Sequence, residues 1–103
     1  MRLPTNSWGF YSRLIPVTSG DQVRIVRANP NRWLVAFQFL TLSGYIYPGR
    51  IDQTPQPIGF VPKQANDRLD FKYWEWGDIV CGEWYCYSPF TNTSLIVFEV
   101  TNR

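Results

Sequence analysis

The sequence predicts an all-β fold, a single-domain antiparallel β-sandwich or jelly-roll-like barrel of about eight strands. β-Branched and aromatic residues recur in short runs, and clusters of Pro, Gly, Asn and Asp separate these runs. No window sustains the 3.6-residue period of an amphipathic helix. The length of 103 residues suits one compact domain, which we expect to span residues 1–103.

Eight segments are expected to form the strands. They are residues 9–17, 22–27, 33–41, 45–47, 58–61, 68–75, 78–87 and 95–101. Apolar and polar residues alternate in 22–27 and 68–75, as in a sheet with one solvated face. In contrast, 33–41 and 95–101 carry apolar residues on both faces, which predicts either central strands or a subunit contact.

Composition excludes several classes of protein. Hydrophobic residues make up 45% of the chain and aromatic residues 17%, which excludes general disorder. Histidine is absent, so the commonest general base and metal ligand is missing. The ten basic residues are scattered, and no apolar stretch is long enough to span a membrane. We therefore expect no cofactor, metal, nucleic-acid or membrane partner.

The two cysteines, Cys81 and Cys86, match neither a redox pair nor a zinc knuckle in their spacing. On one strand they would point to opposite faces, about 17 Å apart at about 3.3 Å per residue, which is beyond disulfide reach. We interpret both as small buried hydrophobic residues. This usage fits a protein made and kept in a reducing cytosol.

Carboxylates beside tryptophans raise the hypothesis of a glycosidase-like acid and base. The residues concerned are Asp70, Glu75, Asp78 and Glu83, beside Trp74, Trp76 and Trp84. Asp70 and Glu75 would lie on opposite faces of one strand, and acidic residues beside aromatic ones are ordinary on a half-solvated sheet. We therefore expect a non-enzymatic protein and assign no catalytic residue.

Trp74 and Trp76 are two residues apart, so a strand would place both indoles on its outward face. Three interpretations remain open. The indoles stack on sugar rings, they bury against another protein, or a turn near Gly77 rotates one of them into the core.

The first residues, 1–8, form a possible extended N-terminal arm. Leu3 and Trp8, followed by Tyr11, flank the polar residues 5–7 without a strand pattern. Such an arm either lies on a partner or folds back over its own sheet, since exposed apolar tails are a liability for a soluble monomer.

A compact turn motif, Ala28-Asn29-Pro30-Asn31-Arg32, separates two of the expected strands. Pro30 sets a φ angle suited to a turn, Asn29 and Asn31 cap it, and Arg32 can donate to carbonyl oxygens across it. With the apolar segment 33–42 and the sequence Tyr-Ile-Tyr-Pro-Gly at 45–49, this motif resembles small β-structured phage virion proteins. The resemblance continues to Val100, but this chain is richer in Trp and has its own segment 81–86.

The resemblance implies a head decoration, cement or fibre-type module. It suggests a capsid decoration protein that binds and stabilises the shell of major capsid protein, forms homo-oligomers, and resides on the phage head surface after synthesis in the host cytoplasm. A tail, neck or fibre component and a carbohydrate-binding β-sandwich remain alternatives. The expected partner contacts are Leu3, Trp8, Tyr11, Trp74, Trp76 and Trp84.

Overall fold

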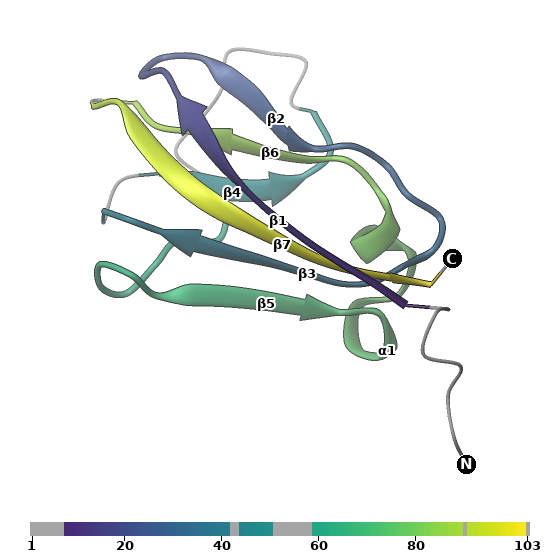
Figure 1. Ribbon diagram of the computed structural model, residues 1–103. Helices are drawn as coiled ribbons and strands as arrows, with labels where there is room; N and C mark the ends of the chain where they lie inside the picture. Colours follow the sequence, from purple (N-terminus) through teal and green to yellow (C-terminus); the bar gives the residue numbers. More distant parts are fainter. Residues whose placement is uncertain (1–7, 42–43, 51–58, 90, 103) are drawn as a thin grey trace.

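Seven antiparallel strands form two sheets in the computed structural model, which describes residues 8–41, 44–50, 59–89 and 91–102 (Figure 1). Sheet A has the order β1-β7-β3-β5, and sheet B the order β2-β6-β4. The strands are β1 (Trp8–Val17), β2 (Gln22–Val26), β3 (Arg32–Phe39), β4 (Tyr45–Pro48), β5 (Arg68–Lys72), β6 (Trp84–Tyr87) and β7 (Thr93–Asn102). The predicted sandwich is confirmed, and the sheets do not close into a barrel.

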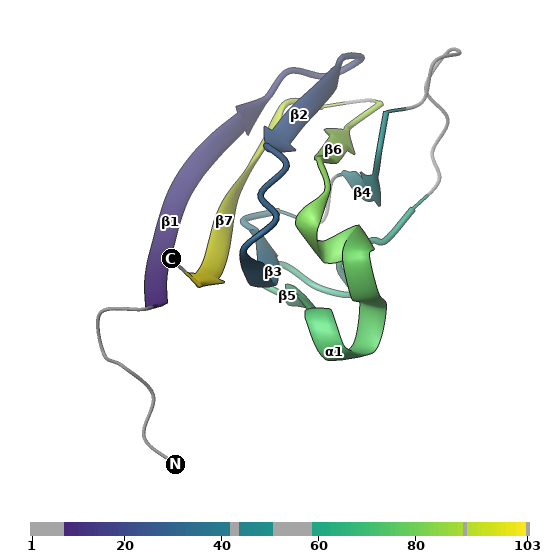
Figure 2. The same cartoon turned by 90° about the vertical axis from the view of Figure 1, so that its right-hand side faces the viewer.

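Consecutive strands alternate between the two sheets, so odd-numbered strands form sheet A and even-numbered strands form sheet B. Figure 2 shows the two layers from the side. Every pairing therefore joins strands that are not neighbours in the sequence, such as β1 with β7. As a consequence, β1 and β7 bring the two ends of the domain together, with Trp8 opposite Asn102.

The core lies between the sheets, and Trp84 of β6 is its largest side chain. Its ring centroid lies 4.6 Å from that of Phe71 and 5.3 Å from that of Phe37. The indole Nε1 donates to the carbonyl oxygen of Ile79 at 3.2 Å, so its polar atom is satisfied inside the core. Because Trp84 is fully buried, the expectation that it contacts a partner is wrong.

Two expected strands are shorter than predicted because a helical segment replaces their adjoining ends. Residues 68–75 form β5 and then one turn of helix, α1 (Tyr73–Trp76). Residues 78–87 begin in the 3-10 helix η2 (Gly77–Cys81), and only Trp84–Tyr87 is a strand. Gly77 ends α1 with a φ of 68°, a left-handed conformation that side chains disfavour, and its N–H donates to the carbonyl oxygen of Tyr73.

The expected strand at 58–61 is reduced to one bridge among the residues that the structure describes. Phe60 exchanges two backbone hydrogen bonds with Ile46, of 2.9 and 2.7 Å, while residue 58 lies outside the described ranges. The remaining expected strands are found with shifts of one or two residues at their ends. This accounts for seven strands where about eight were predicted.

A bulge in β3 decides which side chain of its first two residues faces the core. Leu34 pairs with Val100, whereas Arg32 pairs with Thr101, so β3 carries one extra residue. A bulge of this kind exchanges the faces of the residues before it. Arg32 consequently faces inward and is 2% exposed. Trp33, which strict alternation places inward, is only half-buried.

Arg32 joins the two layers at this end of the sandwich. Its Nε donates to Glu99 Oε1 on β7 at 2.8 Å, and its Nη2 lies 2.7 Å from the same oxygen. Its Nη1 donates to the carbonyl oxygens of Val80 and Gly82, at 2.8 and 2.9 Å, and its Nη2 donates to that of Arg27. The guanidinium thus makes four hydrogen bonds and a close ion pair, as a buried charged group requires. The predicted bond across the turn, to Arg27, is confirmed.

The expected cap by Asn29 is also confirmed. Asn29 Oδ1 accepts from the backbone N–H of Asn31 at 2.9 Å, an Asx turn that caps the motif. The N–H of Arg32 then donates to the carbonyl oxygen of Asn29 at 3.2 Å. On the other side of the ion pair, Arg13 of β1 donates to Glu99 Oε2 at 2.9 Å.

We predict that Arg32→Met lowers the free energy of unfolding by about 3–5 kcal/mol, because it leaves Oε1 of the buried Glu99 carboxylate and three carbonyl groups without their Arg32 donor. Urea unfolding followed by circular dichroism measures this change. The matched control is Arg24→Met, which breaks an exposed pair with Glu83 of 3.0 Å. We expect the control to lose at most about 1 kcal/mol. Equal losses in the two variants would contradict the assigned role of Arg32.

Candidate functional site

The most exposed aromatic residues beyond the strands lie in residues 73–81, which we call the aromatic turn. It comprises α1 and η2 and lies at one end of the sandwich (Figure 1). Trp74 is 67% exposed, and Tyr73, Trp76 and Ile79 are also exposed. Because Trp74 lies in α1, which follows directly after β5, its exposure is a property of the helical turn and not of a strand face.

The aromatic turn is held by packing and by hydrogen bonds beneath its exposed side. The ring centroid of Trp76 lies 5.4 Å from that of Phe71 and 5.6 Å from that of Phe60, both in edge-to-face geometry. Val80 is fully buried, and its carbonyl oxygen accepts from Arg32. The structure thus separates the two tryptophans: Trp76 covers the core, and Trp74 points to solvent. The expected strand placement of both indoles on one outward face is wrong, since a turn before Gly77 rotates Trp76 toward the core.

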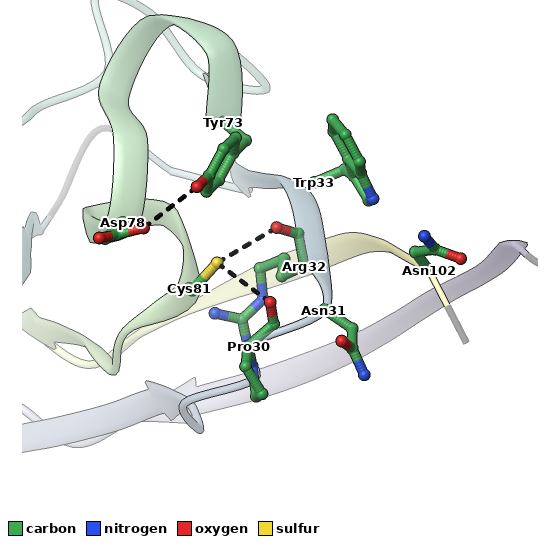
Figure 3. A pocket seen from close by; sticks show the side chains of 8 residues that line it. All are labelled: Pro30, Asn31, Arg32, Trp33, Tyr73, Asp78, Cys81 and Asn102. Carbon is green, nitrogen blue, oxygen red and sulfur yellow. Dashed lines mark hydrogen bonds between the residues drawn. The ribbon is translucent and has the colours of Figure 1, made fainter.

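A pocket of about 520 Å³ opens between the aromatic turn and the turn motif (Figure 3). Trp33 and Tyr73 form its aromatic wall, with ring centroids 5.7 Å apart. The lining residues are Pro30, Asn31, Arg32, Trp33, Tyr73, Asp78, Cys81 and Asn102. The fold therefore brings together two motifs that lie about forty residues apart in the sequence, at the end where β1 begins.

The pocket offers neutral and acidic polar groups to a ligand. Tyr73 donates its hydroxyl to Asp78 Oδ1 at 3.2 Å, and this hydrogen bond with the carboxylate charge raises the pKa of Tyr73. The guanidinium of Arg32 is occupied by Glu99 and by backbone carbonyl oxygens, as described above. Aromatic rings, the amides of Asn31 and Asn102 and one carboxylate thus remain, a set suited to neutral polar ligands.

The other residues expected to contact a partner are distributed as follows. Leu3 lies outside the described residues, as does most of the expected arm. Trp8 already belongs to β1, and Tyr11 of the same strand is exposed. Both lie at the end of the sandwich that carries the aromatic turn, but β1 and β5 are opposite edges of sheet A. Trp84 is in the core, as reported above.

Sequence reasoning missed Trp33 and Tyr73 as surface residues. Strict alternation along each expected strand would place both side chains inward, and each departs from it for a different reason. The bulge in β3 displaces Trp33, and the change from strand to helix displaces Tyr73. A buried Arg adjoining the turn has no signature in sequence that separates it from a solvated one.

The four carboxylates considered for acid–base chemistry each have a separate local partner. Salt bridges join Asp70 to Arg68 at 2.8 Å, Glu75 to Lys72 at 3.6 Å and Glu83 to Arg24 at 3.0 Å. Asp78 accepts from Tyr73, as described above. Among the described residues, no group of three Cys, Asp or Glu side chains is arranged to hold a metal ion.

The two cysteines have different environments, and both are free thiols. Cys86 is fully buried in β6, and burial raises the pKa of its thiol from 9.0 to about 12. Cys81 ends η2, is partly exposed and lies on the pocket, with its Sγ 3.3 Å from the carbonyl oxygen of Arg32. The expectation of a buried residue is thus confirmed for Cys86 and wrong for Cys81. Nor do they share a strand, because η2 ends between them.

Comparison with protein-family models, with curated proteins and with solved structures finds no match to this chain. Within the described ranges, no helix has both the length and the apolar character needed to cross a membrane.

We predict that Ellman's reagent modifies one thiol in the folded protein and both after denaturation, because only Cys81 is accessible. The Cys81→Ser variant should show no rapid reaction until it unfolds, whereas Cys86→Ser should react as the wild type does. Rapid modification of Cys86 in the folded state would contradict its placement.

The raised pKa of Cys86 also links folding to pH. The neutral thiol contributes to the stability of the folded state at neutral pH, and this contribution is lost as the pH rises from 9.0 toward about 12.

Proposed function

We propose that this protein is a non-enzymatic structural protein of a phage virion, a capsid decoration protein that binds the shell of major capsid protein. The observation that carries the proposal is the exposed indole of Trp74 on a turn anchored to the core. Large aromatic side chains on a rigid base are typical anchors of protein interfaces, because little conformational entropy is lost when they bind. The turn motif on which the resemblance to virion proteins rests lies beside this surface.

The position at which β1 begins supports the choice of this end of the sandwich as the contact surface. The chain enters β1 at Trp8, opposite Asn102, and Asn102 lines the pocket beside the aromatic turn. A contact that includes Trp74 at this end would surround the pocket, with apolar anchors and polar residues such as Asn31 at the rim.

We predict that the purified protein co-sediments saturably with phage heads that lack it, and that Trp74→Ala weakens this binding at least tenfold. Because Trp74 is two-thirds exposed, the variant should lose no more than about 0.5 kcal/mol of stability. The matched control is Leu40→Ala, which removes an exposed apolar side chain beyond the opposite end of β3 and should bind as the wild type does.

Removal of residues 1–6 tests the contribution of the arm in the same assay. The decoration role is rejected if folded wild-type protein fails to bind heads at any concentration, and binding to isolated tails instead would assign the protein to the tail or neck. Equal binding by Trp74→Ala and wild type would show that the aromatic turn takes no part in the contact.

A second candidate function, binding of a neutral saccharide, is favoured by the composition of the pocket. Two aromatic rings, two amides and a carboxylate surround a volume of about 520 Å³, which is large enough for one or two sugar rings. Aromatic rings accept the apolar faces of sugars, and amides or carboxylates pair with their hydroxyl groups.

We predict for this candidate that a neutral oligosaccharide quenches tryptophan fluorescence saturably and that Tyr73→Ala abolishes the change. Gln64→Ala, an exposed substitution in the loop beside the far end of β3, is the control and should titrate as the wild type does. Absence of a saturable change across a panel of neutral glycans would eliminate this function.

A further inference from the structure

The outer face of sheet A is apolar, and none of the described elements covers it (Figure 2). Phe10 and Leu14 of the edge strand β1 are 67% and 60% exposed. Such exposure is unusual for two large apolar residues that share one strand face, because leaving them in water forgoes the gain from burial. This surface is distinct from the aromatic turn and takes no part in the proposed capsid contact.

Strand register places more apolar side chains beside these two. Phe10 lies opposite Val100 and Leu14 opposite Ile96 on β7, while Leu34 of β3 lies opposite Val100 from the other side. The ring centroids of Phe10 and Phe98 are 6.1 Å apart, which shows that both project from the same face. The apolar face therefore consists of Phe10, Leu14, Leu34, Ile96, Phe98 and Val100.

The same face carries no charged side chain on β1, β7 or β3. Other outward positions on these strands hold small or neutral polar residues, namely Ser12, Ala36 and Gln38. On this face of the four strands, charges appear on β5, at the edge, where Arg68 pairs with Asp70 and Lys72 pairs with Glu75 of α1. An uncharged apolar centre with a charged rim can meet an identical surface without like-charge repulsion.

The size of the face is consistent with a dimer of modest affinity. Strands lie about 4.8 Å apart and rise about 3.3 Å per residue, so the four strands of sheet A, with the apolar face at the centre and the charged rim on β5, present about 500 Å² in projection. Two such faces bury about 1,000 Å², the lower limit for a specific protein interface. Dimerisation in the micromolar range or weaker is the expected result.

We infer that a second copy of this chain covers the apolar face, so that two A sheets pack against each other about a two-fold axis. A self-complementary face of this kind forms an isologous interface, in which each residue contributes twice. The arrangement extends the sandwich from two layers to four, with the A sheets at the centre and aligned as in other sheet-on-sheet packings. It leaves Trp74 free for a capsid contact, so failure of either proposal leaves the other standing.

Sedimentation equilibrium over micromolar to millimolar concentrations tests this inference. We expect the wild type to pass from monomer to dimer and Leu14→Glu to weaken the dimer at least tenfold, because it places two carboxylates in one apolar interface. The matched control is Gln64→Glu, which adds the same charge at an exposed position off this face and should dimerise as the wild type does.

A second measurement needs no variant and remains decisive if Leu14→Glu fails to fold. Backbone NMR signals of the wild type, recorded through the same concentration range, should shift in β1, β7 and β3 and stay fixed in the aromatic turn. A wild type that stays monomeric throughout, a dimer unaffected by Leu14→Glu, or shifts confined to other strands would each overturn the inference.

Discussion

The buried pair of Arg32 and Glu99 is the interaction on which the rest of this sandwich depends. At the end of the molecule where β2 leads to β3 and η2 leads to β6, the carbonyl groups of Arg27, Val80 and Gly82 lie outside the strands. The guanidinium of Arg32 donates hydrogen bonds to these three carbonyl oxygens and to the carboxylate of Glu99. Because desolvated charges are stable only when fully paired, this constraint determines the path of the turn motif and of η2 together.

This constraint also explains why a short irregular segment can present a functional surface. The aromatic turn has one face sealed by Trp76 and Val80 and the other open at Trp74. Its backbone is tied to β3 through Arg32, so the exposed indole is carried on a rigid support although it belongs to no sheet. Rigid anchors of this kind lose little entropy on binding, which is why we propose a capsid contact at this end and self-association through the flat face of sheet A.

Much of the fold could be predicted from residue patterns, whereas the candidate site could not. The short β-rich runs and their turn residues located most of the strands, and Val35, Phe37 and Phe39, which alternation places on one face of β3, all lie in the core. Alternation failed for Trp33, because one extra residue in β3 reverses the faces before it. It failed again beyond Lys72, where the chain leaves the sheet and coils into α1.

By itself the sequence determined the all-β class, the single domain, most strand positions and the Asx-capped turn, since each depends on local pattern and backbone preference. Only the tertiary structure decided the alternation of strands between sheets, the burial of Arg32 and Trp84, and the surface that Trp33, Tyr73 and Asp78 share. These features depend on contacts between residues distant in the chain. A side chain's burial there is set by its neighbours across the sheets and not by its own segment.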